Sequence, residues 1–72
     1  MQVFIYWNQI YLLEVSDSTF ISDIKKMIKE KSKINNDDIF LTHATKILQD
    51  NMTLSDYSIS ENSSIHVNNR LR

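Results

Sequence analysis

The chain has 72 residues and a formal net charge of −1, from eight Lys and Arg against nine Asp and Glu. This length suits one domain with one core, and the near-neutral charge disfavours a general polyanion binder. The absence of cysteine excludes disulfides, thiolate catalysis and thiolate metal sites. Residues 1–72 are therefore expected to form a single domain with a loose tail at 69–72. Because so small a core can spare few residues for chemistry, the functional residues of the domain are expected on its surface.

The start of the chain predicts neither export nor membrane insertion. Residues 1–6 are too short for a signal peptide and have no positively charged beginning. The longest uncharged run, 4–13, covers about half of a membrane span and includes two amide side chains. We therefore expect a cytoplasmic or nuclear protein in a reducing compartment.

Two alternating stretches predict a β-hairpin at the start of the chain. Residues 1–6 and 10–15 alternate as strands, and 7–9 form the turn, with Asn8 best suited to the left-handed position. The side chains expected on the core side are Val3, Ile5, Tyr11, Leu13 and Val15.

An amphipathic helix is expected next. Ser18 or Thr19 is the predicted N-cap, and the helix is predicted to end near Ser32. Ile34 follows as an isolated apolar residue that is expected under the core. The apolar stripe is Ile21, Ile24 and Ile28 with Met27 on its flank, and the opposite side carries Lys25, Lys26, Lys29 and Lys33. Acidic residues lie close to these lysines in the sequence, which favours a solvated face over a contact with nucleic acid or acidic lipid.

Short elements are expected in the second half of the chain. After a loop at 35–38, the sequence predicts strands at 39–43 and 46–48 and a last strand at 64–68. The inward side chains of the first and last of these strands are Leu41, Ile65 and Val67.

A capped helical turn is predicted between those strands. Thr53 begins it, and Asp56 is expected to bond back to the Thr53 amide. Leu54 and Ile59 are expected to point inward from its two ends. Tyr57 is expected to bury its ring while its hydroxyl finds a backbone partner.

Turn chemistry is unusual because the chain contains neither glycine nor proline. Turns that need a positive φ must then use Asn or Asp. The asparagines suited to such positions are Asn8, Asn35, Asn36, Asn51, Asn62, Asn68 and Asn69.

The order hairpin, helix, two short strands, helical turn and strand predicts an α+β fold. One main helix packs across a mixed sheet of four to five strands. This order resembles the β-grasp fold of the ubiquitin family, and single residues agree along nearly the whole chain. The matching residues are Met1-Gln2-Val3-Phe4-Ile5, Leu13-Glu14-Val15, Ile21, Ile24, Lys25, Ile28, Lys31, Leu41, Ala44, Lys46, Leu48, Thr53 to Ile59, His66 and Arg70-Leu71-Arg72.

Departures from the family pattern are as informative as the matches. The family's attachment tail continues into two glycines, and this sequence stops at Arg72. The resemblance therefore implies either a domain that is never conjugated or a modifier whose last residues are missing here. Two glycine turn positions of the family correspond to Lys33 and Thr45, where we expect rebuilt or strained turns.

The family's apolar recognition patch is also changed. Its central isoleucine corresponds to Thr42 and its valine to Asn68, while His66 carries over. Losing two buried apolar contacts lowers affinity for the usual ubiquitin readers by on the order of a hundredfold.

Partner binding is nevertheless expected on the outer sheet face, because aromatic residues and arginine dominate binding hot spots. Trp7 is either a binding anchor at the hairpin tip or a local clasp over Tyr6 or Asn69. Phe4 and Leu12 form either a secondary docking patch or incidental exposed apolar surface. The partner-binding candidates are Tyr6, Trp7, Phe40, Thr42, Lys46, His66, Asn68 and Arg70.

No catalytic or metal-binding pattern is visible. Ser, His and Asp occur without a nucleophile elbow and without glycine for an oxyanion nest. His43 and His66 lack a third ligand nearby. His66 is expected to be a surface recognition residue and His43 a packed or rim residue. No enzyme activity, metal or cofactor is predicted.

The sequence and its resemblance together imply a monomeric, non-catalytic interaction domain. The leading hypothesis is an N-terminal module of a larger protein that docks to ubiquitin–proteasome machinery. Its partner is then a ubiquitin receptor, a proteasome subunit or a ubiquitin-pathway enzyme, and neither nucleic acid nor a membrane. The alternatives are a divergent modifier truncated before its Gly-Gly, and a mimic that occupies ubiquitin enzymes without being transferred.

Overall fold

The computed structural model describes residues 1–32 and 39–69. The predicted elements are present, with bounds within about two residues of those expected. Lys33, Ile34, the loop at 35–38 and residues 70–72 of the predicted tail lie outside the described residues. The predicted start of the tail at Asn69 is wrong, because Asn69 is the last residue of the final strand and pairs with Ile39. The elements are β1 (Gln2–Trp7), β2 (Gln9–Glu14), α1 (Ile21–Ser32), β3 (Ile39–His43), β4 (Lys46–Leu48), the 3₁₀ turn η1 (Ser55–Tyr57) and β5 (Ser63–Asn69).

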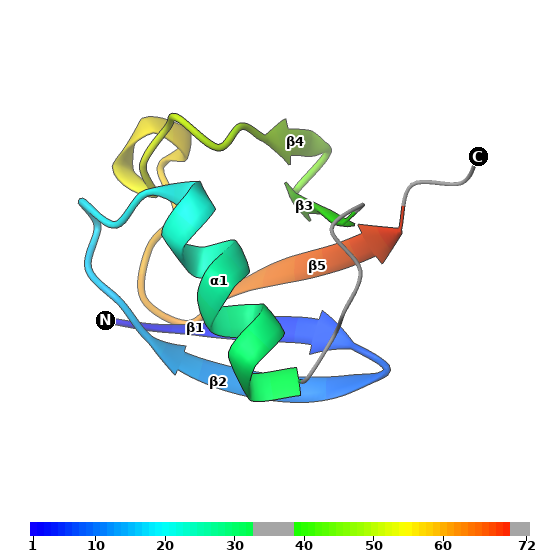
Figure 1. Cartoon of the computed structure of the whole chain (residues 1–72). Helices are drawn as coiled ribbons and strands as arrows, with labels where there is room; N and C mark the ends of the chain where they lie inside the picture. The colour runs from blue at the N-terminus through cyan, green and yellow to red at the C-terminus, as the bar shows by residue number, and fades with distance from the viewer. Residues whose placement is uncertain (33–38, 70–72) are drawn as a thin grey trace.

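The strands form one mixed sheet in the order β2-β1-β5-β3-β4. β1 and β5 run parallel, and the other neighbouring pairs are antiparallel. α1 lies across one face of this sheet (Figure 1). The α+β arrangement with five strands and one main helix is confirmed.

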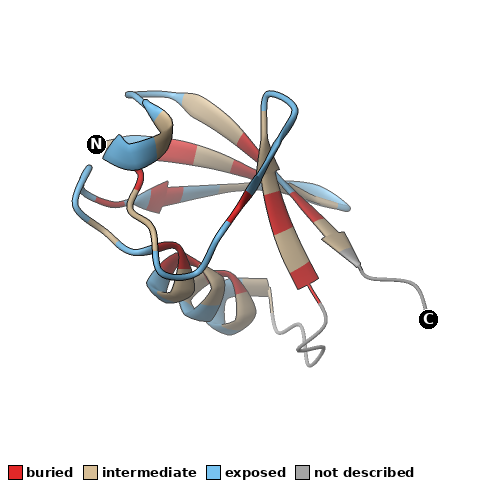
Figure 2. Ribbon diagram, turned by 90° about the horizontal axis from the view of Figure 1, so that it is seen from above, coloured by how far each residue is buried: buried red, intermediate tan, exposed pale blue. Residues whose placement is uncertain are grey.

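The core lies between α1 and the sheet, and both layers contribute buried residues, which are red in Figure 2. Within the described residues, every buried residue is apolar. Strand alternation predicted most of this core, while Ile39 and Leu48 join it from β3 and β4. The buried set is Val3, Ile5, Leu13, Val15, Ile21, Ile24, Ile28, Ile39, Leu41, Leu48, Leu54, Ile59, Ile65 and Val67.

The start of α1 is capped by a distant loop. The Ile21 N–H donates to the Met52 carbonyl at 2.9 Å, and the Ser22 N–H donates to the Asp50 carbonyl at 3.2 Å. The Thr19 hydroxyl instead accepts from the Ser16 N–H at 3.1 Å. The prediction that Ser18 or Thr19 caps the helix is therefore wrong, because backbone carbonyls from the other half of the chain occupy the donors that a cap would satisfy.

The turn around η1 keeps the predicted bonds of Asp56 and Tyr57 but not the predicted cap, because its N-cap residue is Leu54 rather than Thr53 and makes no side-chain cap hydrogen bond. The Thr53 N–H donates to Asp56 Oδ2 at 2.8 Å. Tyr57 packs against the core, and its hydroxyl accepts from the Gln49 N–H at 2.9 Å. Leu54 and Ile59 are buried at the two ends of the turn.

Four described residues have positive φ: Asn8 at 54°, Ala44 at 53°, Ser58 at 57° and Asn62 at 66°. Asn8 and Asn62 agree with the expectation that Asn replaces Gly in such turns, whereas Ala44 and Ser58 contradict the expectation that only Asn or Asp would do so. A rebuilt or strained turn is expected at Thr45, and in the structure the left-handed position of this β3–β4 turn falls on Ala44. The strained residue thus lies one position before Thr45, in the two-residue turn that the pair of His43 and Lys46 closes.

Ala44→Gly is expected to stabilise the fold by roughly 0.5–1 kcal/mol. Removing Cβ relieves the left-handed penalty of about 1–2 kcal/mol, and the greater freedom of Gly in the unfolded chain offsets part of this gain. Urea denaturation followed by circular dichroism measures the difference. Thr45→Gly is the matched control and should destabilise, since its φ is not positive. Equal destabilisation by both changes would contradict the argument.

Candidate functional site

The face of the sheet turned away from α1 carries one row of side chains that crosses all five strands. Strand alternation and register place Ile10 beside Tyr6, Tyr6 beside His66, His66 beside Thr42, and Thr42 beside Ile47. We call these five residues the cross-sheet row. None of them is Lys, Arg, Asp or Glu, so the row is a continuous strip without formally charged side chains from one sheet edge to the other.

Two rings stack at the middle of the cross-sheet row. The centroids of Tyr6 and His66 are 5.0 Å apart, and their planes differ by 25°. His66 is exposed and Tyr6 is half-buried. The parallel pairing of β1 with β5 creates this contact because it places Tyr6 directly beside His66.

A polar pair lies next to the stacked rings. The Asn68 Nδ2 donates to the Thr42 hydroxyl at 3.3 Å, between neighbouring strands. Phe40 lies directly across from Asn68 in the register of β3 and β5, and it is half-buried. The candidates Tyr6, His66, Thr42, Asn68 and Phe40 therefore share one face.

Apolar surface gathers where this face reaches the hairpin. Phe4 pairs with Leu12, and Tyr6 pairs with Ile10. Ile10 is 60% exposed and Leu12 is 43% exposed. We call Phe4, Tyr6, Ile10 and Leu12 the hairpin patch. The predicted pair of Phe4 and Leu12 is thus half of a larger apolar surface.

Sequence reasoning missed Ile10 and Ile47, which lie at the two ends of the cross-sheet row. Ile47 is 58% exposed. The sequence does contain a signal for Ile10. If Tyr11, Leu13 and Val15 point inward, strand alternation turns the side chain of residue 10 outward. Ile47 lies in a strand of three residues, which is too short for an alternating pattern to predict which way its side chain points.

Trp7 does not share this face. It is the last residue of β1, on the side of Val3 and Ile5, and it packs against the core. The turn is shorter than the predicted 7–9: it consists of Asn8 alone, because Trp7 and Gln9 are the last paired residues of β1 and β2. The expectation that Trp7 joins the outer-face candidates is wrong, since pairing continues to the end of the strand and fixes its side.

The remaining candidates lie at the rim or beyond the described residues. Lys46 is exposed at the start of edge strand β4, opposite His43, as expected for an edge position. Arg70 lies outside the described residues. His43 Nδ1 is 2.9 Å from the Ser64 carbonyl oxygen, which makes His43 a half-buried rim residue. Because a carbonyl only accepts, Nδ1 carries the proton in this bond.

Other site classes receive no support from the part of the chain that the structure describes. Among residues 1–32 and 39–69, no group of three or more His, Cys, Asp or Glu side chains is placed to hold a metal ion. No helix in those ranges is long and apolar enough to cross a membrane.

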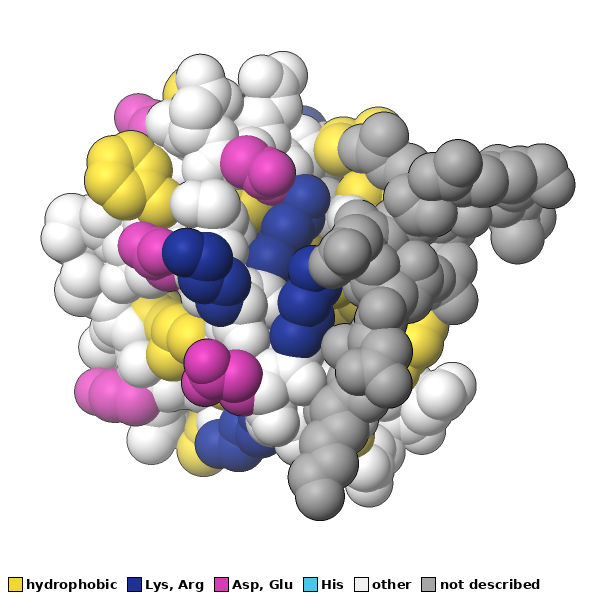
Figure 3. Space-filling view, viewed as in Figure 1, with side chains coloured by type: hydrophobic (Ala, Val, Ile, Leu, Met, Phe, Trp, Pro, Cys, Tyr) yellow, Lys and Arg dark blue, Asp and Glu magenta, His cyan; other side chains and the backbone are white. Residues whose placement is uncertain are grey.

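The helix side of the molecule has a different character. Lys and acidic side chains lie intermingled over α1 (Figure 3). The Lys25 Nζ is 2.6 Å from Asp50 Oδ1, which ties the helix to the loop that caps its start. The contrast between a mixed-charge helix side and an uncharged cross-sheet row makes the outer sheet face the candidate binding surface.

A comparison with protein-family models matches the ubiquitin family over residues 4–72. The match spans the helix, the whole of β2 to β5 and most of β1. It therefore includes every member of the cross-sheet row and of the hairpin patch.

Proposed function

Because the chain belongs to the ubiquitin family, we propose that it is a non-catalytic interaction domain that docks a larger protein to ubiquitin–proteasome machinery in the cytoplasm or nucleus. Ubiquitin-like domains generally mediate protein–protein interactions and are generally not catalysts. The docking partner and the compartment are the parts of this proposal that go beyond family membership.

The cross-sheet row is the observation that carries the proposal. Protein interfaces are depleted of charge at their centres and enriched in aromatic residues. The stacked Tyr6 and His66 provide such a centre, and the exposed side chains of Ile10 and Ile47 flank it. This chemistry favours a protein partner over nucleic acid, for which a basic surface is needed.

The apolar surface is arranged differently from the family's recognition patch. The positions that correspond to the family's isoleucine and valine hold Thr42 and Asn68, which bond to each other. Apolar side chains instead cluster in the hairpin patch, toward the β2 edge. We infer a partner that covers the hairpin and the stacked rings rather than the centre of the family's patch.

Tyr6→Ala and His66→Ala are expected to weaken binding to a purified proteasomal ubiquitin receptor, each by about tenfold. Each change removes one ring of the stack at the centre of the surface, and truncation of a hot-spot residue costs about 1–2 kcal/mol or more. Biolayer interferometry with the immobilised chain measures the affinities. Lys26→Ala on the exposed helix side is the control and should bind as the unchanged protein does.

Two outcomes would count against this proposal in different ways. Equal binding by both ring variants and the unchanged protein would remove the outer face as the site. Absence of binding to proteasomal receptors, with the chain folded, would remove the proteasome as the partner.

A divergent modifier is the second candidate, favoured by one observation. The family match extends to residue 72 and so includes the Arg70-Leu71-Arg72 segment that precedes the attachment glycines in the family. Codons for Gly-Gly directly after Arg72 would support the modifier, and a long further reading frame would support the docking domain. A mimic of ubiquitin would bind an activating enzyme without forming an adenylate or a thioester.

A further inference from the structure

Four side chains next to the stacked rings form a square on the outer sheet face. Strand register places Phe40 beside Asn68 and Thr42 beside His66, and alternation turns all four to the same side. The Asn68 Nδ2 donates to the Thr42 hydroxyl at 3.3 Å along one diagonal of the square. The other diagonal has a ring at each end, and the His66 ring also stacks on Tyr6. The square is therefore a polar pair flanked by two rings.

Three hydrogen-bonding groups of this pair remain open. In the part of the chain that the structure describes, the bond that Thr42 and Asn68 share is the one seen for either side chain. A hydroxyl that accepts a bond keeps its own O–H to donate, and a side-chain amide that has used one N–H keeps the other N–H and its carbonyl oxygen. Both residues are half-buried, so solvent still reaches these two donors and one acceptor.

A partner on the outer face changes the surroundings of the pair. Such a partner is anchored on the hairpin patch and the stacked rings, and its border falls on the pair because Thr42 lies directly beside His66. Covering the open groups with apolar surface would remove their water and leave them unsatisfied, which is costly. A site built for hydrogen bonds rejects analogues that lack them by large factors. The pair therefore selects for a polar group on the partner.

A carboxamide is the side-chain group that satisfies all three open groups. Its oxygen can accept from the free N–H of Asn68 and from the Thr42 hydroxyl, while its NH₂ donates to Asn68 Oδ1. Two parallel bonds to a planar neighbour are the geometry by which Asn and Gln recognise adenine. A hydroxyl offers one oxygen, which would have to bond to both ends of the Asn68 amide at poor angles.

Charged groups fit the pair less well than a carboxamide. A carboxylate only accepts and leaves Asn68 Oδ1 without a donor, whereas an ammonium or guanidinium only donates and leaves the Thr42 hydroxyl without an acceptor. The cross-sheet row contains no Lys, Arg, Asp or Glu that would offset the charge of a covered ion. Hydrogen bonding and charge thus favour the same neutral group.

We propose that Thr42 and Asn68 determine the specificity of the outer face by binding a Gln or Asn side chain of the partner protein. Apolar partner residues contact the hairpin patch and provide affinity, and the carboxamide beside them provides selectivity. This inference rests on the proposed function, since it takes the outer face as the docking surface. It adds the chemistry of the residue that the partner must present.

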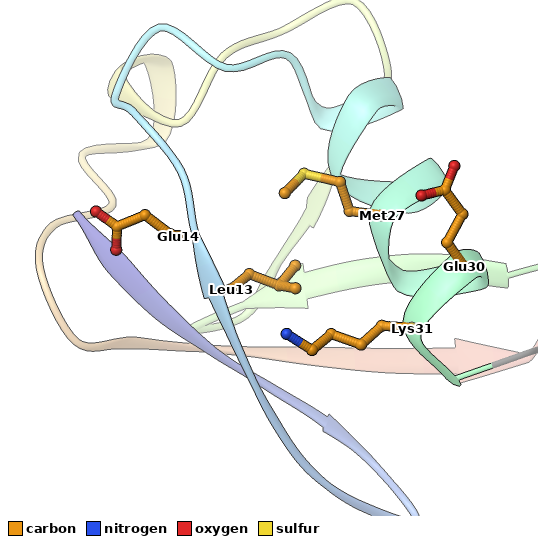
Figure 4. A pocket seen from close by; sticks show the side chains of 5 residues that line it. All are labelled: Leu13, Glu14, Met27, Glu30 and Lys31. Carbon is orange, nitrogen blue, oxygen red and sulfur yellow. The ribbon is translucent and has the colours of Figure 1, made fainter.

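The hollow on the helix side of the sheet has a different chemistry. It lies between β2 and α1, has a volume of about 400 Å³, and the Lys31 side chain extends across it from the helix (Figure 4). The Lys31 ammonium is 3.0 Å from the Leu12 carbonyl oxygen, and Glu30 also lines the hollow. Because this site is charged and lies on the other side of the sheet, its residues serve as controls for the outer face.

Selection from a phage-displayed library of random dodecapeptides tests the proposal. The unchanged chain is the bait, at slightly alkaline pH where histidine is neutral. Outer-face binders are the peptides that bind the unchanged chain but not Tyr6→Ala. These peptides should share a Gln or Asn at one fixed position among apolar residues. A consensus with an apolar or charged residue at every fixed position would overturn the proposal.

Substitutions in one selected peptide measure the contribution of the carboxamide. Replacing its Gln or Asn by Leu should weaken binding to the unchanged chain by about tenfold to a hundredfold, as fluorescence polarisation measures. On the double variant Thr42→Val with Asn68→Leu, the preference should reverse, because both surfaces are then apolar. Circular dichroism checks that this variant is folded. The same preference for the carboxamide on both proteins would contradict the assignment.

Two control variants should leave the affinity for the selected peptide unchanged. Ser64→Ala removes a hydroxyl from the same side of β5, two residues before His66. Glu30→Gln removes a charge from the hollow beside α1. A loss of affinity in Ser64→Ala as large as in the double variant would show that the effect is not specific to Thr42 and Asn68.

Failure of this inference is distinguishable from failure of the proposed function. If no selected peptide depends on Tyr6, the outer face is not the docking surface, and both proposals fall. If the peptides depend on Tyr6 but carry no carboxamide, only the specificity proposed for Thr42 and Asn68 falls. Sedimentation velocity should show a monomer, and a dimer that Asn68→Leu disperses would make a second copy the occupant instead of a partner protein.

Discussion

Leu54→Ala is expected to lower the free energy of unfolding by about 2–5 kcal/mol, the range measured for buried Leu truncations. The Leu54 side chain is fully buried in the core. Its N–H donates to the Thr19 carbonyl at 3.3 Å, and its carbonyl accepts from the N–H groups of Tyr57 and Ile59, both at 3.1 Å. These backbone bonds hold Leu54 where the segment before α1, the turn η1 and the chain leading to β5 meet.

The consequence for the protein is large because the domain is small. Stabilities of about 5 kcal/mol are common for domains of this size, so the substitution is expected to leave a measurable unfolded fraction without denaturant. Urea denaturation by circular dichroism, together with the dispersion of amide resonances, measures the effect. Ile47→Ala, at a residue that is 58% exposed, is the control and should change stability by less than about 1 kcal/mol. A similar loss in both variants would show that Leu54 has no special place in the core.

Thr42→Ile combined with Asn68→Val is expected to raise affinity for a domain that reads the family's apolar patch by on the order of a hundredfold. The double change restores the two apolar side chains that the ubiquitin family presents at these positions, and their burial contributes a few kcal/mol. Thr42 and Asn68 lie on adjacent strands and bond to each other. Replacing both partners together therefore leaves neither a donor nor an acceptor unsatisfied.

Isothermal titration calorimetry with a purified ubiquitin-interacting domain measures this gain. Lys26→Ile adds the same kind of side chain to the exposed helix side and should leave the affinity unchanged. If the double variant binds no better than the unchanged chain, the outer face differs in shape from the family's recognition surface. Thr42 and Asn68 would then not be equivalent in binding to the isoleucine and valine of the family's patch.

The sequence by itself determined the elements and the side that most residues of the longer strands face. The alternation in residues 1–6 and 10–15 fixed Val3, Ile5 and Leu13 as core residues, and the structure buries all three. The helical spacing of Ile21, Ile24 and Ile28 fixed the face of α1 in the same way. These features follow from periods of 2 and 3.6 residues, which are properties of the local backbone and need no knowledge of distant segments.

Tertiary structure alone decided which residues meet. The helix start is capped by the Asp50 and Met52 carbonyls, about thirty positions further along the chain, so a local search for Ser or Thr found the wrong cap. Tyr6 and His66 stack because β1 and β5 pair in parallel, which no local pattern encodes. Neighbours across strands depend on register and chain closure, which are set only when the whole core packs. The sequence therefore predicted Tyr6, His66 and Thr42 as members of the binding face, but it missed Ile10 and Ile47 and did not give the arrangement of the row.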